Sequence, residues 1–507
     1  MVMRTSSLFA IVLLGVVMAT AGVAVIRRWQ GSAKIQRDGS VIKLAKGGDL
    51  QNALDQARPG DTIILEAGAV YEGPFTLPAK PGSEFITIQT SRLAELPEGA
   101  RVSPSQSALF AKLQSAENGS PIVKTDARAH HYKFAGIEFS TTNEKVVARD
   151  LIRLGANEQT TLDSVPHHLV IDRSYIHGYP TQDVQRGIAL NSADTNITNS
   201  YISDIHGRGY DTQAICGWNG PGPFKIINNY LEGAGENVMF GGADPAIPNL
   251  IPSDIEIRDN HFFKPMSWKV DDPSYAGKHW TVKNLFELKN ARRVVIDRNI
   301  FENHWVDAQP GPAILFTVRN DGGRAPWATI EDVTFSNNIV RNAPTGLNFL
   351  GTDDVKPSQR AQRITISNNL FTGLSAAFMW MSGYHNVTIS NNTHIQSGNI
   401  MTLYGDVSPG FVYQNNITIR SPKGYGVKGD ASGEGNIALK QFTPQATFRN
   451  NVIVGANASQ YPSNNFYPAS AAEVGFMGFE RGDFRLNPGS RYKGVGVNFD
   501  LLPKLSR

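Results

Sequence analysis

Short apolar runs return along most of the chain, each followed by a polar residue, an asparagine and one or two further apolar residues. The clearest copy is Arg292–Phe301, in which Asn299 follows the apolar run. Runs of this length with alternating apolar positions are typical of short β-strands. The same order of residues is found in Asp254–Phe262, Asp332–Val340, Arg363–Phe371, Asn386–His394, Gly410–Thr418 and Gln445–Ile453.

Aligning the copies places one asparagine at the same point of each. These asparagines are Asn229, Asn260, Asn299, Asn338, Asn369, Asn392, Asn416 and Asn451, and Ser174 and Ser200 hold the same place earlier in the chain. Repeats of roughly 23 to 39 residues indicate a stacked array, and strands this short favour an all-β, single-stranded right-handed parallel β-helix. We expect each asparagine to tolerate a left-handed bend and to hydrogen-bond to the asparagine of the next coil.

A second family of strands runs beside the asparagine family, one strand in each coil. Its members also alternate apolar and polar positions, which predicts a second wall of the same solenoid. They are Ile152–Leu154, Gly187–Asn191, Gln213–Gly217, Asn237–Gly241, Leu285–Lys289, Ala313–Arg319 and Gly346–Leu350.

The ends of the solenoid need covers, because an exposed strand edge pairs with other chains. Gly47–Arg58 has the apolar spacing of an amphipathic helix and is predicted to cap the first coil, with Thr62–Leu65 as the first strand. We therefore divide the chain into a linker at 31–41, a β-helix at 42–485 and a tail at 486–507.

Residues 1–30 are predicted to be an export segment. The apolar run Leu8–Ile26 follows Arg4 and precedes Arg27 and Arg28, which is the order of a signal sequence. The run is also long enough to cross a bilayer, so a cleaved signal peptide and a retained anchor both fit. Either one places the rest of the chain outside the cytoplasm. Only this segment would contact the membrane.

Composition narrows the choice of partner. The formal net charge of the 507 residues is +3, which is too small to indicate nucleic-acid binding. Cys216 is the one cysteine, so no disulfide can form within the chain. A solenoid with loops above its coils offers a groove, and such a groove fits an extended polymer such as a polysaccharide.

Candidate chemistry lies on the strand Leu285–Lys289. Alternation turns Phe286 and Leu288 inward, so that Glu287 and Lys289 face outward. In the strand of the next coil, Thr317 and Arg319 face outward by the same rule. Stacking in register would place Arg319 beside Lys289 at about 5 Å.

Two cations so close would lower the pKa of Lys289 and make its amine a base that can remove a carbon-bound proton. Arg319 would hold a carboxylate, and Glu287 would orient the pair. These are the parts required for β-elimination of a uronic-acid polymer. The alternative is an ion cluster without catalytic function, which stabilises the fold by about 0–1 kcal/mol.

Three further residues are candidates for substrate binding. Asp244 follows a Gly-Gly bend, and Thr317 lies on the same strand face as Arg319. Trp305 is an aromatic residue that can stack on a sugar ring. The adjacent pairs His130-His131 and His167-His168 lack the spacing of a metal motif with any cysteine or carboxylate. We interpret these four as edge or turn histidines.

The opening of the chain carries a resemblance to a known family. Ala53–Gly68, Ala-Leu-Asp-Gln-Ala-Arg-Pro-Gly-Asp-Thr-Ile-Ile-Leu-Glu-Ala-Gly, followed by Tyr71–Gly73, resembles the start of pectin-lyase-like right-handed β-helix proteins, most of all the chondroitinase B and alginate lyase family. The resemblance implies Lys289 as the base and Arg319 as the catalytic arginine. It also implies calcium, but Val282 and Asn284 stand where the family has its calcium carboxylates, and Asp244 or Asp271 would have to replace them.

The sequence therefore predicts an exported β-helix protein that acts on acidic polysaccharide, with a lyase reaction as the sharper hypothesis. The rival hypothesis is a carbohydrate-binding or adhesion solenoid without catalysis.

Overall fold

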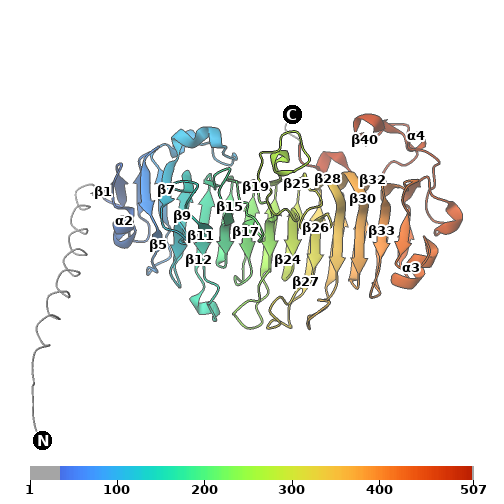
Figure 1. The fold of residues 1–507 in the computed structure, drawn as a ribbon, viewed down its shortest axis with the longest axis horizontal. Coiled ribbons are helices and arrows are strands. Elements are labelled where there is room, and N and C mark those ends of the chain that lie inside the picture. The colour runs from blue at the N-terminus through green and yellow to red at the C-terminus, as the bar shows by residue number, and fades with distance from the viewer. Residues whose placement is uncertain (1–34, 505–507) are drawn as a thin grey trace, which may run out of the picture.

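The computed structural model describes residues 35–504, and these residues form one long parallel β-helix (Figure 1). The export segment predicted for residues 1–30 lies outside the described residues. Within them, no helix is long and apolar enough to cross a membrane. Each coil contributes up to three strands, and the coils stack so that equivalent strands pair in parallel ladders.

Ladder A contains the strands that precede the asparagines. Its strands, in order of pairing, are β1 (Ile35–Asp38), β2 (Val41–Leu44), β3 (Thr62–Leu65), β6 (Ile86–Thr90), β9 (His130–Ala135), β12 (His167–Asp172), β15 (Ala193–Thr198), β18 (Phe224–Ile227), β21 (Ser253–Arg258), β24 (Ala291–Asp297), β27 (Ile330–Ser336), β29 (Gln362–Ser367), β31 (His385–Ser390), β34 (Val412–Gln414) and β37 (Thr447–Arg449).

Ladder B contains the strands that follow the asparagines. It consists of β4 (Val70–Gly73), β7 (Ala111–Ser115), β10 (Ile137–Thr141), β13 (Tyr175–His177), β16 (Tyr201–Ser203), β19 (Tyr230–Glu232), β22 (His261–Phe263), β25 (Ile300–Glu302), the first parts of β28 (Ile339–Leu350) and β30 (Leu370–Ser382), β32 (Thr393–Gln396), β35 (Ile417–Ile419) and β38 (Val452–Val454).

Ladder C is the second strand family predicted from the sequence. It consists of β5 (Phe75–Leu77), β8 (Val123–Thr125), β11 (Ala148–Leu154), β14 (Val184–Leu190), β17 (Gln213–Gly217), β20 (Glu236–Phe240), β23 (Phe286–Leu288), β26 (Pro312–Thr317), the second parts of β28 and β30, β33 (Asn399–Leu403) and β36 (Val427–Gly429). All seven predicted segments are confirmed.

The hydrogen-bond ladder of asparagines is also confirmed, but the left-handed bend expected at each asparagine lies one residue earlier, at Arg298 before Asn299 for example. The side-chain amide of Asn299 donates to Asn338 Oδ1 at 3.0 Å, and the backbone N–H of Asn299 donates to the same oxygen at 2.8 Å. The same pair of bonds links each predicted asparagine from Asn229 to Asn451 to the next. Asn465 adds a further rung that the sequence pattern missed, because only 14 residues separate it from Asn451.

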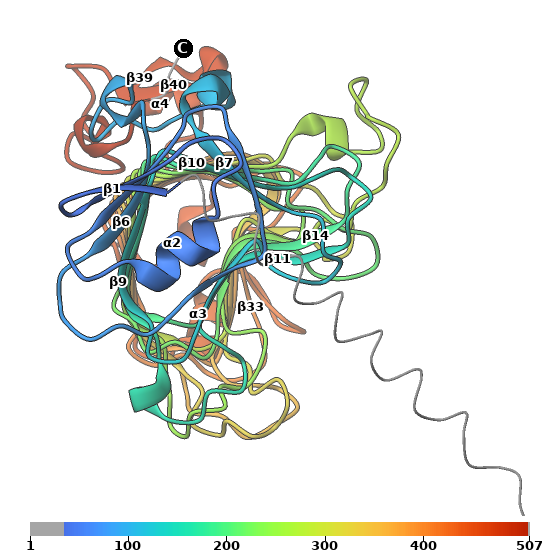
Figure 2. The ribbon, with the colours of Figure 1, turned by 90° about the vertical axis from the view of Figure 1, so that its left-hand side faces the viewer.

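The interior is one continuous hydrophobic core that runs from Ile42 to Tyr461. Viewed from its N-terminal end, the solenoid is covered by α2 (Leu50–Gln56), whose Leu50, Ala53 and Leu54 are buried (Figure 2). The predicted cap is therefore confirmed, although the helix is shorter than expected because Asp49 caps its N-terminus. At the other end, α3 (Asn436–Phe442) buries Ala438, Leu439 and Phe442.

Two segments differ from the prediction. Part of the expected linker forms β1, which pairs antiparallel with β2. The closing region contains α4 (Ala471–Val474) and the antiparallel pair β39 (Phe476–Gly478) and β40 (Asp483–Leu486). Beyond β40 the chain folds back along the coils, where Asn498 N–H donates to Asn368 Oδ1 at 2.6 Å. Both segments are held by hydrogen bonds between backbone groups. Such bonds do not depend on side-chain type, so the hydrophobic pattern of the sequence does not reveal them.

Candidate functional site

The outer face of ladder C carries ionisable side chains in β20 and β23 and in the segments that follow β23 and β26. In β23, Phe286 and Leu288 are fully buried in the core, and Glu287 points outward, as alternation predicted. Glu287 Oε1 accepts a hydrogen bond from the Thr317 hydroxyl at 3.3 Å, and its Oε2 accepts one from the Asn284 amide at 3.1 Å. Glu287 is only 2% exposed.

Lys289 lies between two carboxylates. Its Nζ is 3.9 Å from Glu287 Oε1 and 3.9 Å from Asp321 Oδ1. Gly241 of the preceding coil lies directly against Lys289 and has a backbone φ of 111°. A Cβ at Gly241 would lie 2.6 Å from Lys289 Cβ. Only glycine fits this close approach, which places the lysine against the wall.

The predicted pairing of Lys289 with Arg319 is wrong at the level of the side chains. Leu288 pairs with Phe316, so the register is shifted by two residues from the expected one. The backbone N–H of Arg319 donates to Lys289 O at 3.0 Å, but its guanidinium contacts Asp353 at 3.6 Å and Asp354. Alternation fixes the face of a strand but not its register, and the acidic loop after β28 then attracts the guanidinium.

The predicted lowering of the Lys289 pKa is also wrong. Burial disfavours the charged ammonium, but Glu287, Asp321 and Glu236 favour it more strongly, so that the pKa is raised. Lys289 is therefore an ammonium at neutral pH and not a free amine.

Asp321 is the residue of this site that the sequence did not reveal. Burial raises the pKa of its carboxyl, Asp244 and Glu287 raise it further, and Lys289 and Arg319 oppose the shift. Its side chain is 32% exposed, so this carboxylate is open to solvent. The surrounding Asn-Asp-Gly-Gly sequence indicates only a turn, and nothing in it shows that the turn folds back over Lys289.

Asp244 positions that turn. Its carboxylate accepts the backbone N–H groups of Gly322 at 2.9 Å and Arg324 at 2.8 Å. A Cβ at Gly322 would lie 2.6 Å from Asp244 Oδ2, so the turn closes tightly on the carboxylate. The side chain of Asp244 is 1% exposed and cannot reach a polymer, which corrects its predicted role in substrate binding.

A second lysine extends the cluster across the wall. Lys283 Nζ lies 2.6 Å from Asp211 Oδ2 and 3.2 Å from Glu236 Oε1. Burial raises the pKa of Glu236, and nearby Glu287 adds to the shift while Lys283 opposes it. We call the series Asp211, Lys283, Glu236, Glu287, Lys289 and Asp321 the charged row.

Calcium, which the resemblance implied, does not fit these carboxylates. The ammonium of Lys283 lies between Asp211 and Glu236, and Glu287 faces an amide, a hydroxyl and Lys289. Within the part of the chain that the structure describes, the three-residue group suited to a metal ion consists of histidines and lies on ladder A. Asp271, the other proposed substitute, is absent from that group.

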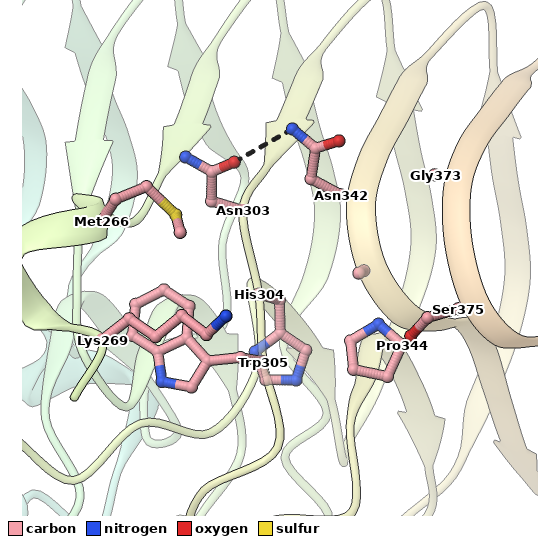
Figure 3. Close-up of a pocket in the computed structure, with 10 residues that line it drawn as sticks. Met266, Lys269, Asn303, His304, Trp305, Asn342, Pro344, Gly373 and Ser375 are labelled. Atoms are coloured by element: carbon pink, nitrogen blue, oxygen red, sulfur yellow. Dashed lines mark hydrogen bonds between the residues drawn. The ribbon is translucent and has the colours of Figure 1, made fainter. Parts of the chain in front are cut away.

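Trp305 lies apart from the charged row. It packs against Ala234, Trp268 and Trp280, which precede β20 and β23, whereas Lys289 and Asp321 follow β23 and β26. Trp305 lines a cavity of about 480 Å³ together with Met266, Lys269 and Asn303 (Figure 3). The structure therefore does not join Trp305 and Lys289 into one predicted site.

A neighbouring cavity reaches the charged row. It has a volume of about 510 Å³, and its lining includes Tyr210, Asp211, His279, Trp280 and Asp307. Because Asp211 also holds Lys283, the cavity opens at one end of the charged row. Aromatic rings and carboxylates side by side can hold the apolar face and the hydroxyl groups of a sugar.

Comparisons with known proteins agree with this architecture. A family model described as right handed beta helix region matches residues 317–466. A PL6 alginate lyase in complex with a trisaccharide matches over 92% of this chain and 94% of its own, with 10% identity and a TM-score of 0.53. The catalytic unit of a GH87 α-1,3-glucanase from Streptomyces thermodiastaticus strain HF3-3 matches over 87% and 72%, with 12% identity and a TM-score of 0.52.

The PL6 family alginate lyase AlyGC matches over 92% of this chain with 13% identity and a TM-score of 0.49, and this chain spans 59% of the AlyGC chain. No curated protein matches the sequence. At these identities the likenesses establish the fold and not the activity. The chain thus has a right-handed parallel β-helix fold.

Proposed function

We propose that the protein is a lyase that cleaves an acidic, uronate-containing polysaccharide at the charged row. The observation that carries the proposal is the setting of Lys289, an ammonium held on the outer wall between the carboxylates of Glu287 and Asp321. The match to an alginate lyase along nearly the whole of both chains supports it. The β-helix fold hosts several activities, so the proposal of a lyase is based on the charged row and not on the fold alone.

The reaction would be a β-elimination. A base removes the proton beside the uronate carboxylate, a carbon–carbon double bond forms, and the bond to the glycosidic oxygen breaks. The leaving oxygen takes a proton from solvent. The first step requires a cation that neutralises the uronate carboxylate, because the neighbouring carbon-bound proton is then more acidic.

The raised pKa of Lys289 suits it to supply that cation, in place of the base role predicted from the sequence. Asp321 is the group that we assign as the base. Its carboxylate faces the same ammonium, is open to solvent, and is more basic than an ordinary aspartate because of its raised pKa. Glu287 and Thr317 position Lys289, and the exposed guanidinium of Arg324 is available for a further carboxylate of the polymer.

The test is incubation of the full chain with alginate, chondroitin and pectate, with and without calcium, while the ultraviolet absorbance of an unsaturated uronate end is followed. We expect Lys289→Ala and Asp321→Asn to lose at least about 100-fold in rate, since each removes a group that acts in the transition state. Lys289→Arg keeps the charge and should retain more activity than Lys289→Ala. Lys428→Ala is the control, because Lys428 occupies the same ladder at a distant coil.

Two outcomes would contradict the proposal. Activity that survives Lys289→Ala would place the reaction elsewhere on the chain. Retention of a polymer without any absorbance change, on all three polymers, would instead support the rival function of a carbohydrate-binding solenoid.

We also propose that the protein works outside the cytoplasm, on the strength of the apolar run Leu8–Ile26 between arginines. Fractionation of cells that express the full chain should recover it in the secreted or membrane fraction. Recovery in the cytosol would contradict this location.

A further inference from the structure

Four histidines from two coils meet on the outside of ladder A. His130 and His131 begin β9, His167 and His168 begin β12, and His167 pairs in register with His130. The rings of His130 and His167 stack with centroids 4.9 Å apart, and those of His131 and His168 stack at 4.3 Å. The sequence analysis interpreted these residues as edge or turn histidines, and the structure shows that they also lie together. We call the group the histidine quartet.

The backbone explains why neighbouring side chains converge. In a regular strand two successive side chains point to opposite faces. His131 and His168 instead adopt left-handed conformations, with φ of 58° and 54°. This bend turns each one toward the histidine that precedes it, so that the Nδ1 atoms of His130 and His131 lie 2.8 Å apart and those of His167 and His168 lie 2.7 Å apart.

A carboxylate from the next coil orients one ring. His168 Nε2 lies 3.0 Å from Asp194 Oδ2, so the proton of a neutral His168 is held at Nε2 and the lone pair is left on Nδ1. A carboxylate behind a histidine is the usual outer partner of a histidine that binds a metal ion. One ligand atom from each of His131, His167 and His168 lies within 4.8 Å of the others.

We propose that the histidine quartet binds a divalent first-row transition-metal ion, with Cu²⁺ or Ni²⁺ preferred over Zn²⁺. Imidazole nitrogen suits all three ions. With metal–nitrogen bonds of about 2.0–2.1 Å, adjacent ligands lie about 2.9 Å apart in a square plane and about 3.3 Å apart in a tetrahedron. Within each pair the two Nδ1 atoms are at hydrogen-bonding distance, 2.8 and 2.7 Å, and lie close enough for both to reach one ion in either geometry, so the preference for Cu²⁺ over Zn²⁺ rests on the general order of metal affinities.

The surroundings leave the site accessible. The side chain of His168 is 43% exposed. A cavity of about 450 Å³ lies beside His130 and His167, with room for a water molecule as a further ligand. The two cations on its wall are already engaged, since Arg128 pairs with Asp163 and Lys80 Nζ donates to Asp55 O at 2.5 Å.

The electrostatic environment also favours the neutral form of two of these imidazoles, His131 and His167. Burial lowers the pKa of His131 and His167, and the neighbouring histidines lower it further, against the opposing effect of Asp194. Neutral imidazole is the form that ligates a metal ion.

The test is calorimetric titration of the chelator-treated full chain, without a histidine tag, with Cu²⁺, Ni²⁺ and Zn²⁺ in turn. We expect one ion per chain, tighter binding of Cu²⁺ than of Zn²⁺, and an electron paramagnetic resonance spectrum of bound Cu²⁺ with several nitrogen ligands. Asp194→Asn should weaken binding about 10- to 100-fold, because it loses the carboxylate behind His168.

The variant His131→Ala/His168→Ala should lose the binding. His385→Ala is the matched control, because His385 also begins a ladder A strand before a left-handed residue, Asn386, but has no second histidine beside it. Absence of saturable binding in the wild type, or unchanged binding in the double variant, would overturn the proposal. If the double variant does not fold, a wild-type Cu²⁺ spectrum without nitrogen ligands would overturn it equally.

Discussion

At the scale of single residues, the surroundings of a group decide its chemistry more than its type does. Lys289 faces outward as the strand pattern predicted, but its partners come from a turn and a register that the pattern does not specify. The role that we propose for the lysine is therefore that of a cation, in place of the base predicted from the sequence. The convergence of His131 with His130 could not be predicted either, because a left-handed residue overrides the alternation rule.

His394 provides a prediction at this scale. It is fully buried, stacks on Phe378 at 3.8 Å, and lies 2.6 Å from the Tyr413 hydroxyl, and burial lowers its pKa to about 3. The unfolded chain takes up a proton at this histidine below about pH 6.5, whereas the folded chain stays neutral. Its contribution to stability is therefore complete above pH 6.5 and is lost progressively as the pH falls toward 3.

At pH 5 this loss amounts to about 2 kcal/mol in the free energy of unfolding, from about 1.4 kcal/mol per pH unit. Urea unfolding of the wild type and of His394→Asn at pH 7 and pH 5 measures it. We expect a smaller pH dependence in the variant, and equal dependence in the two proteins would contradict the assignment.

At the scale of elements, the repeating coils were predictable because each rung uses the same residue at the same bend. The strand families and their asparagines could be located from spacing alone. By contrast, β28 and β30 run through a corner and join ladders B and C, with 12 and 13 residues. Pro344 and Gly373 at the corner are turn residues that predict a break between two strands, and the irregular register where β28 and β30 pair has no sequence signature of its own.

Asn338 tests the energetic role of the asparagine ladder. Its Oδ1 accepts both the backbone N–H and the side-chain amide of Asn299, and all these groups are buried. Asn338→Ala leaves the buried backbone N–H of Asn299 without an acceptor, while the Asn299 amide keeps its bonds to the Ile257 and Asp297 carbonyls, and it should destabilise the protein by about 1–3 kcal/mol. Urea unfolding gives the value.

Asn348→Ala is the control for that measurement, because Asn348 lies in the same strand, β28, but on the outer face of ladder C. We expect a much smaller change there. Similar losses in the two variants would show that the ladder contributes no special stability.

At the scale of the whole molecule, the solenoid places residues that are far apart in sequence on a common surface. The histidine quartet lies on the early coils of ladder A, and the charged row lies near the middle of ladder C (Figure 1). In a stacked array each coil interacts mainly with its neighbours. The two proposed sites should therefore act independently, and the metal should not be required for cleavage.

The end cap provides a prediction at this scale. Leu54 of α2 is fully buried over the first coils, and a charge there would be unpaired. Leu54→Glu should displace the helix, expose the strand edge beneath it and promote association of chains. Sedimentation velocity should show species larger than the monomer for Leu54→Glu. The control Gln56→Glu, on the exposed side of α2, should sediment like the wild type. A monomeric Leu54→Glu protein would contradict the role of the cap.

The pH dependence of kcat/KM for cleavage of a uronate polymer tests the central assignment most directly. If Lys289 is the cation and Asp321 the base, activity should rise as the Asp321 carboxyl ionises, with a midpoint above the usual aspartate range. Asp321→Asn should abolish this rise. Activity that instead increases only in the alkaline range, as a free lysine amine requires, would contradict the account.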